Sequence, residues 1–150
     1  MFKVSKILAP IDFSECSRAA LAHALSLAEQ LGASVDALYV AEIPSFKFEP
    51  RVAKEGGFTS LREYAIEAGQ AELDAFLGKL EPSQRKNVSA RIDVGGPRDC
   101  ILELAKRERY DLIVMGTNGR TGRAHSLAGS VAESVVRMAP CPVLTVRAPD

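Results

Sequence analysis

The chain has 150 residues, of which 47% are hydrophobic and 25% charged, so it is long enough for one domain with its own core. Its formal net charge is zero, which argues against a protein that coats nucleic acid or an anionic membrane, because both favour a basic excess. No apolar run approaches the roughly 20 residues that span a bilayer, and the stretch before Pro10 lacks the features of a signal peptide, so we expect a cytoplasmic protein with one domain over residues 1–150.

The N-terminal part predicts a strand, a helix and a second strand. Lys6 to Ile11 is a short and nearly continuous apolar run, as expected of a buried parallel strand. Ser14 is placed to cap a helix whose apolar residues recur at helical spacing, and Gly32 ends that helix. Val35 to Ala41 follows as the second strand.

Residues 42–58 are predicted to form a loop. Pro44 and Pro50 interrupt any helix there, and Gly56-Gly57 loosen the end of the segment.

A second helix is predicted after this loop. Ser60 and Glu63 have the spacing of a capping box, and apolar residues from Leu61 to Leu80 lie on roughly one side. Gly69 and Gly78 lower the intrinsic helix propensity of this segment.

The second half of the chain continues the alternation of strands and helices. Its predicted elements are a half-buried strand near a sheet edge at Val88–Val94, a helix after Pro97, a strand at Leu112–Met115, a glycine-bearing loop at 116–128, a helix at Gly129–Met138 and a strand at Val143–Arg147.

Strands separated by helices run parallel with right-handed crossovers. The sequence therefore predicts an α/β protein with a doubly wound five-stranded parallel sheet, strand order 3-2-1-4-5, and helices on both faces. Ligands of such folds bind beyond the carboxyl ends of the strands where the strand order reverses, which here is the crevice between the first and fourth strands.

Residues suited to phosphate binding follow both of those strands. Asp12 ends the first strand, and Gly129-Ser130 open a helix whose N-terminus offers free backbone N–H groups and a partial positive charge. Arg120 and Arg123 lie in the intervening loop and can neutralise phosphate. Each residue taken alone is more often a turn glycine, a helix cap or a solvated carboxylate, but together they converge on one crevice.

The string Gly116-x2-Gly119-x9-Gly129-Ser130 resembles the glycine motif of ATP-binding universal stress proteins. The opening Ile7 to Ser14 and the closing Cys141 to Val146 also look like that family, so the resemblance covers the whole chain. Asn118 stands where members of the family often carry His or Arg.

The resemblance implies specific roles for residues of this chain. Asp12 and the backbone around Val40 would hold adenine and ribose, and Met115 and Gly116 would line the same pocket. The phosphates would be surrounded by Gly119, Gly129, Ser130 and Val131. The candidate ligand-binding residues are Pro10, Asp12, Val40, Met115, Gly116, Gly119, Arg120, Gly129, Ser130 and Val131.

The expected function is ATP binding by a nucleotide-dependent regulatory module with at most slow hydrolysis. A slow ATPase or phosphotransfer enzyme, with magnesium held by Asp12 and the phosphates, is an alternative, as is binding of another adenine nucleotide. Walker A and Rossmann glycine patterns are absent, as is the acidic cluster of a phospho-receiver domain. His23 falls within the first helix, His125 falls in the ligand loop, and no Ser-His-Asp order stands out.

Cys16, Cys100 and Cys141 are far apart and have no Cys-x-x-Cys spacing, which argues against disulfides and thiolate zinc sites. We expect three reduced and mostly buried thiols, with a redox role for Cys16 disfavoured.

The last strand is predicted to mediate a homodimer. The order 3-2-1-4-5 places it at a sheet edge, and an apolar edge strand is an aggregation hazard unless something pairs with it. A second copy related by a two-fold axis, pairing through Val143, Leu144 and Val146, is the simplest partner, and the family resemblance implies the same. The alternative is that residues 42–58 shield this strand within one monomer.

Overall fold

Five parallel strands form the centre of the structure, a computed structural model that describes residues 1–118 and 130–148. In sheet order they are β5 (Val88–Val94), β2 (Ser34–Ala41), β1 (Lys6–Ile11), β6 (Leu112–Gly116) and β7 (Val143–Val146). Each neighbouring pair is parallel. The predicted order 3-2-1-4-5 is confirmed, because β5, β6 and β7 are the third, fourth and fifth strands of this sheet in chain order.

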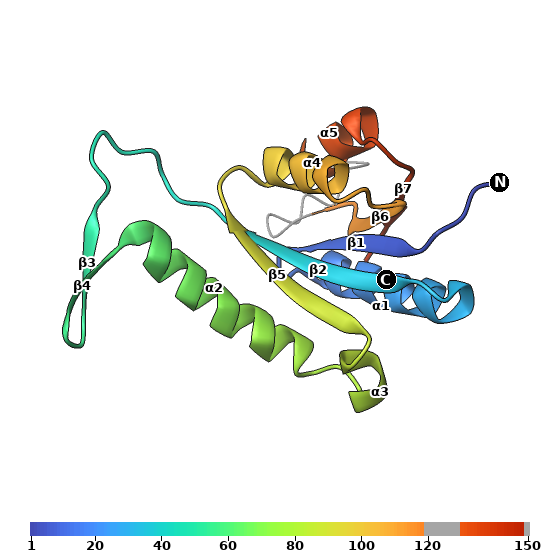
Figure 1. Ribbon diagram of the computed structural model, residues 1–150, viewed down its shortest axis with the longest axis horizontal. Helices are drawn as coiled ribbons and strands as arrows, with labels where there is room; N and C mark the ends of the chain where they lie inside the picture. Colours follow the sequence, from blue (N-terminus) through green and yellow to red (C-terminus); the bar gives the residue numbers. More distant parts are fainter. Residues whose placement is uncertain (119–129, 149–150) are drawn as a thin grey trace.

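Helices cover both faces of the sheet (Figure 1). The helices α1 (Glu15–Leu31) and α2 (Leu61–Leu77) pack on one face, and α4 (Pro97–Arg107) and α5 (Ser130–Met138) pack on the other. A single turn, α3 (Pro82–Arg85), connects α2 to β5. Gly129, predicted to open the last helix, lies outside the described residues.

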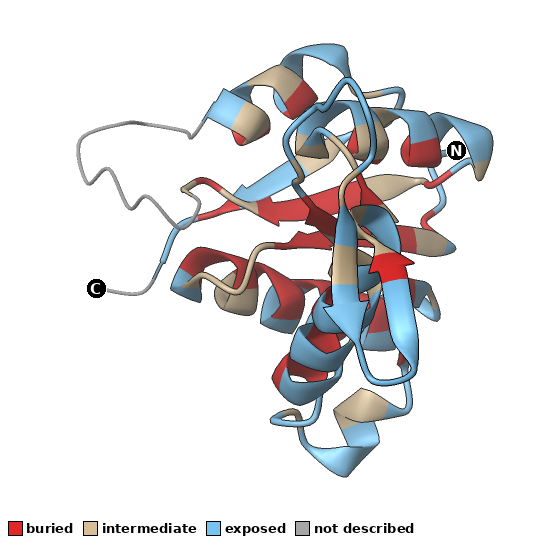
Figure 2. Cartoon of the chain, turned by 90° about the vertical axis from the view of Figure 1, so that its left-hand side faces the viewer, coloured by how far each residue is buried: buried red, intermediate tan, exposed pale blue. Residues whose placement is uncertain are grey.

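Residues on the two faces of β1 belong to different cores. Ile7 packs with Leu21 of α1 and Leu73 of α2, whereas Leu8 packs with Ile113 and Val135 under α4 and α5. All six side chains have at most 1% of their surface exposed. Figure 2 shows this burial along the strands, with the exposed residues on the outer sides of the helices.

The helix boundaries follow the predicted caps. Ser14 has extended backbone geometry, and its hydroxyl accepts a hydrogen bond from the Ser17 N–H at 3.2 Å. Gly32 adopts a φ of 67°, the left-handed conformation that glycine takes readily at a helix C-terminus. The Ser60 hydroxyl accepts from the Glu63 N–H at 3.0 Å. α2 ends at Leu77, three residues before the predicted apolar pattern ends at Leu80.

The prediction of a loop over residues 42–58 was wrong in its second half. The chain there forms an antiparallel hairpin of β3 (Arg51–Lys54) and β4 (Gly57–Ser60). Gly56 has a φ of 85° in the turn between them, so this glycine closes a hairpin instead of loosening a loop. The hairpin contacts α2, where the Thr59 hydroxyl donates to the Glu63 carboxylate.

The last strand ends at Val146, one residue before the predicted end at Arg147. Within residues 1–118 and 130–148, no helix combines the length and apolar character that crossing a membrane requires.

Candidate functional site

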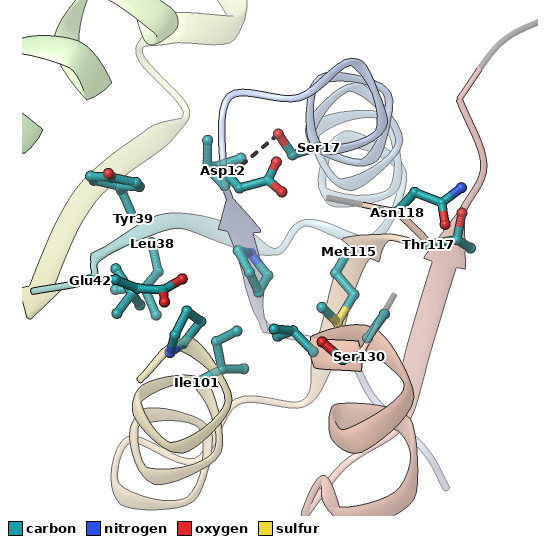
Figure 3. Close-up of a pocket in the computed structure, with 17 residues that line it drawn as sticks. Asp12, Ser17, Leu38, Tyr39, Glu42, Ile101, Met115, Thr117, Asn118 and Ser130 are labelled. Carbon is teal, nitrogen blue, oxygen red and sulfur yellow. Dashed lines mark hydrogen bonds between the residues drawn. The ribbon is translucent and has the colours of Figure 1, made fainter. Parts of the chain in front are cut away.

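A cavity of about 410 Å³ lies at the carboxyl ends of β1, β2 and β6, beside the N-termini of α4 and α5 (Figure 3). This is the crevice that the strand order predicts. Its lining residues are Pro10, Ile11, Asp12, Ser17, Leu38, Tyr39, Val40, Glu42, Pro97, Ile101, Met115, Gly116, Thr117, Asn118, Ser130, Val131 and Ala132.

The crevice opens because β1 and β6 separate towards their carboxyl ends. Their paired positions are Ile7 with Leu112 and Leu8 with Ile113, whereas β1 stays paired with β2 through Ile11. The Lys6 carbonyl accepts from the Asp111 N–H on the β6 side, and alternation along the strand turns the nitrogen of Pro10 to that side as well. Proline has no N–H to continue a ladder, so this position favours separation of the two strands.

Asp12 occupies a tight turn between β1 and α1. Its carboxylate accepts hydrogen bonds from the Ser14 backbone N–H at 3.0 Å and from the Ser14 hydroxyl. Its own N–H donates to the Ser17 hydroxyl at 3.4 Å, the contact drawn in Figure 3. Ser17 in turn donates to the Ser14 carbonyl at 3.0 Å. The turn thus holds the Asp12 carboxylate at the edge of the cavity.

Gly116, the last residue of β6, lets that strand contact the first turn of α1. A Cβ added there would lie 2.6 Å from the Cys16 Cβ and 2.8 Å from the Cys16 carbonyl carbon. Because one of these atoms belongs to the Cys16 backbone, α1 could not move aside easily to make room for a side chain. A residue without a side chain is therefore required where β6 enters the cavity wall.

The charges of the described lining are unevenly placed. Asp12 and Glu42 contribute two carboxylates on the side of β1 and β2, whereas α5 presents its N-terminus at Ser130 on the other side (Figure 3). A helix N-terminus carries a partial positive charge and N–H groups without intrahelical partners. The cavity therefore has an acidic side and an anion-attracting side, separated by apolar residues.

Seven of the ten predicted ligand-binding residues line this cavity: Pro10, Asp12, Val40, Met115, Gly116, Ser130 and Val131. The other three, Gly119, Arg120 and Gly129, lie outside the described residues, as do Arg123 and His125. The fold thus brings together residues that are up to 121 positions apart in sequence, from Pro10 to Val131.

Sequence reasoning missed most of the wall formed by β2 and α4, of which it named only Val40. Leu38, Tyr39 and Glu42 come from the end of β2, and Pro97 and Ile101 come from α4. The strand-end position of Glu42 and the helix-start position of Pro97 were signals in the sequence. Which side chains of α4 reach the cavity depends on how that helix packs, which no local pattern specifies.

The described lining has few titratable side chains. Its titratable side chains are Asp12, Tyr39 and Glu42, and the Ser17 hydroxyl is engaged within the Asp12 turn. His23 lies elsewhere, exposed on α1, with its Nδ1 2.9 Å from the Ala19 carbonyl oxygen. One or two carboxylates together with phosphate oxygens are a usual environment for Mg²⁺, so the acidic side fits a metal that arrives with a nucleotide.

Comparison with known proteins agrees with this architecture. Residues 3–147 match the universal stress protein family, and the chain belongs to it. Universal stress protein MJ0531 of Methanocaldococcus jannaschii is 38% identical over 144 residues, which cover 96% of this chain and 82% of that protein. The family resemblance carried by the glycine motif is thus confirmed.

Solved structures with the same fold include two close in shape. UspA from Lactobacillus plantarum has a TM-score of 0.77 and 26% identity, covering 97% of this chain and 99% of that one. A universal stress protein solved in complex with cAMP has a TM-score of 0.67 and 25% identity, covering 97% of this chain and 98% of that one.

Proposed function

We propose that this protein binds an adenine nucleotide, preferentially ATP, in the cavity between β1, β2 and β6, and acts as a nucleotide-dependent regulatory module in the cytoplasm. The observation that carries the proposal is the pairing of a helix N-terminus at Ser130 with carboxylates at Asp12 and Glu42 across one cavity. A molecule with an anionic end and a hydrogen-bonding end matches that polarity.

The lining suggests how such a ligand lies. Leu38, Val40, Ile101 and Met115 offer apolar surface to a flat ring, and the Asp12 carboxylate can accept hydrogen bonds from ribose hydroxyls. The phosphates would lie at the N-terminus of α5, with Ser130 adding a hydroxyl donor. Arg120 and Gly129, which the glycine motif assigns to the same end, belong to this proposal on sequence grounds.

Support for the ligand class comes from the structural relative solved with cAMP, an adenine nucleotide. The preference for ATP rests on the glycine motif and on the N-terminus of α5 at the cavity. Magnesium is proposed to accompany the triphosphate, because the described lining has no lysine or arginine side chain to neutralise the phosphates.

Calorimetric titration of the wild-type protein with ATP, cAMP and adenosine tests the proposal. We expect ATP to bind with at least micromolar affinity. Ser130→Glu places a negative charge where the phosphates are proposed, and it should weaken ATP binding at least about tenfold while changing adenosine binding little. Because a carboxylate is favourable in the first turn of a helix, this variant should remain folded.

Ser83→Glu is the matched control, since it adds the same charge to the exposed first turn of α3, outside the cavity. Equal loss of ATP binding in both variants, or no ATP binding by the wild type, would contradict the proposal.

A slow ATPase is the second candidate; it requires the alternative arrangement in which Asp12 holds a metal at the phosphates instead of accepting from the ribose. Turnover far below the roughly 10 per second of typical enzymes is expected. Phosphate release at enzyme-like rates that disappears in Asp12→Ala would identify the protein as a dedicated ATPase instead.

A further inference from the structure

Phe13 has a backbone conformation that aromatic residues rarely adopt. Its φ is 66°, in the left-handed region, and among the described non-glycine residues only Arg109 shares a positive φ. Phe13 lies between Asp12, which lines the cavity, and Ser14, which caps α1. Unfavourable backbone geometry of this kind persists only where surrounding contacts hold it in place.

The contacts that hold Phe13 come from β2 and α2. Its ring centroid lies 4.6 Å from that of Tyr39 and 5.5 Å from that of Phe76, the latter in an edge-to-face arrangement. The Arg18 guanidinium lies 4.6 Å above the Phe76 ring, on the same aromatic group. Tyr39 lines the cavity, whereas Phe13 and Phe76 do not.

The turn that contains Phe13 is also packed against β6. Cys16, three residues after Phe13, packs against Gly116 of β6 with no room for a Cβ between them. The turn from Asp12 to Ser17 is therefore held between β6 on one side and the aromatic group on the other. Within it, the Asp12 carboxylate accepts from Ser14, so a displaced Phe13 would displace the carboxylate.

We propose that Phe13 is a positioning residue for the ligand cavity, and that α2 contributes to ligand affinity through the contact of Phe76 with the Phe13 ring. The ligand itself rests on the proposed function. The consequence is that a helix whose residues do not line the cavity sets the position of the Asp12 carboxylate within it.

Calorimetric titration of four variants with ATP tests this proposal. Phe76→Leu keeps an apolar side chain but removes the ring, and it should weaken ATP binding roughly threefold to tenfold, the range expected for an aromatic pair. In Phe13→Asn, the asparagine can adopt the left-handed backbone conformation but has no aromatic ring. This variant should therefore lose at least as much ATP affinity as Phe76→Leu. Phe13→Tyr retains the ring and should bind as the wild type does.

Val88→Ala is the control for a purely structural effect. Val88 is buried at the amino end of β5, away from the cavity, so its truncation should lower thermal stability and leave ATP affinity unchanged. Wild-type affinity in Phe76→Leu and Phe13→Asn would overturn the proposal. So would an affinity loss in Val88→Ala equal to theirs.

Amide hydrogen exchange separates this inference from the proposed function. The Ser14 and Ser17 N–H groups donate within the turn, so both should exchange faster in ligand-free Phe76→Leu than in wild type, while Val88→Ala should leave them protected. If the wild type binds no ATP, the nucleotide proposal fails and this measurement alone decides the role of Phe13. Unchanged exchange at both amides would then refute it.

Discussion

Pro10, Phe13 and Gly116 shape the cavity through their backbones. Pro10 cannot extend the ladder towards β6, Phe13 turns the chain with a φ of 66°, and Gly116 admits the first turn of α1 at a distance no Cβ could occupy. None of the three needs a reactive side chain for these effects. The chemistry at the cavity edge depends on the groups that they place, above all the Asp12 carboxylate.

The three cysteines differ in burial, although the sequence predicted that most of them are buried. Cys16 is buried, whereas Cys100 and Cys141 are of intermediate exposure, so the prediction of mostly buried thiols holds for one of three. Burial and the neighbouring carboxylate of Asp93 raise the pKa of Cys100 to about 11, and burial raises the pKa of Cys141. These two thiols therefore stay protonated at neutral pH.

Alkylation of Cys100 should accordingly be slow at pH 7. The thiolate is the reactive form, so the rate of iodoacetamide labelling at Cys100 should rise as the pH approaches 11. Peptide mass spectrometry after timed labelling measures this rate, with Asp93→Asn as the comparison. Removing that carboxylate's charge lowers the pKa of the thiol and should speed labelling at pH 9. Full labelling of folded Cys100 within minutes at pH 7 would refute the prediction.

Among the secondary-structure elements, α2 contains a glycine whose role the sequence pattern did not indicate. Gly69 lowers the intrinsic helix propensity of this segment. The structure shows why a glycine stands there, since an added Cβ would lie 2.5 Å from the Ile92 Cδ1 and 3.0 Å from the Tyr39 ring. The glycine lets α2 lie close against β2 and β5. Because Tyr39 also lines the cavity, the spacing between α2 and the sheet bears on the shape of the ligand site.

Gly69→Ala should therefore destabilise the protein although alanine favours helices. Overpacking typically costs about 1–3 kcal/mol, which exceeds the roughly 1 kcal/mol gained from helix propensity. Gly78→Ala is the matched control, since Gly78 has a φ of −64° at the end of α2 and its added Cβ would lie 3.1 Å from the Asp74 carbonyl oxygen and 3.5 Å from that of Ala75. Urea unfolding should give a lower free energy of unfolding for Gly69→Ala than for Gly78→Ala. The reverse order would show that Ile92 and Tyr39 yield easily.

Across the whole molecule, the two ends of the sheet are closed in different ways. At the amino end, Arg91 donates to Glu108 at 2.7 Å, Lys6 lies 3.6 Å from the same carboxylate, and Tyr110 donates to Asp36. Burial and the Asp36 carboxylate raise the pKa of Tyr110, so its hydroxyl remains a donor. The amino end is thus closed by paired charges, while the carboxyl end holds the cavity.

The two edges of the sheet differ as well. The hairpin of β3 and β4 contacts α2, which packs on β2 and β5, at the edge opposite β7. Shielding of β7 by residues 42–58, the alternative to a dimer, therefore lacks support in this arrangement. Leu144 of β7 remains 38% exposed. Pairing of this edge with a second copy stays our prediction.

The hydrogen bonds of β7 identify the substitution that tests the dimer. Carbonyls of Pro142 and Val146 accept from β6, so by alternation Leu144 also faces β6, and the N–H of Thr145 points outward. Thr145→Pro removes an outward donor and should convert the dimer to a folded monomer. Leu144→Pro should instead disrupt the β6–β7 ladder and lower stability. Light scattering at tens of micromolar distinguishes the outcomes, and a monomeric wild type would refute the dimer.

The sequence by itself determined the order of the main strands and helices, their parallel arrangement and the crevice at which strand order reverses. These follow from apolar periodicity, helix caps and the handedness of crossovers, which are local or general properties of a chain. Asp12, Met115 and Ser130 were predictable as cavity residues because they stand at the ends of elements. The glycine motif added the family.

Only the tertiary structure decided which further groups share the cavity and what holds them. Tyr39, Glu42 and Ile101 enter it because β2 and α4 pack where they do, and Phe13 meets Phe76 across 63 residues of sequence. The hairpin at 51–60 escaped prediction because its strands have four residues each, too short for a clear alternation. Contacts between residues distant in sequence arise from packing of whole elements, and no local pattern encodes them.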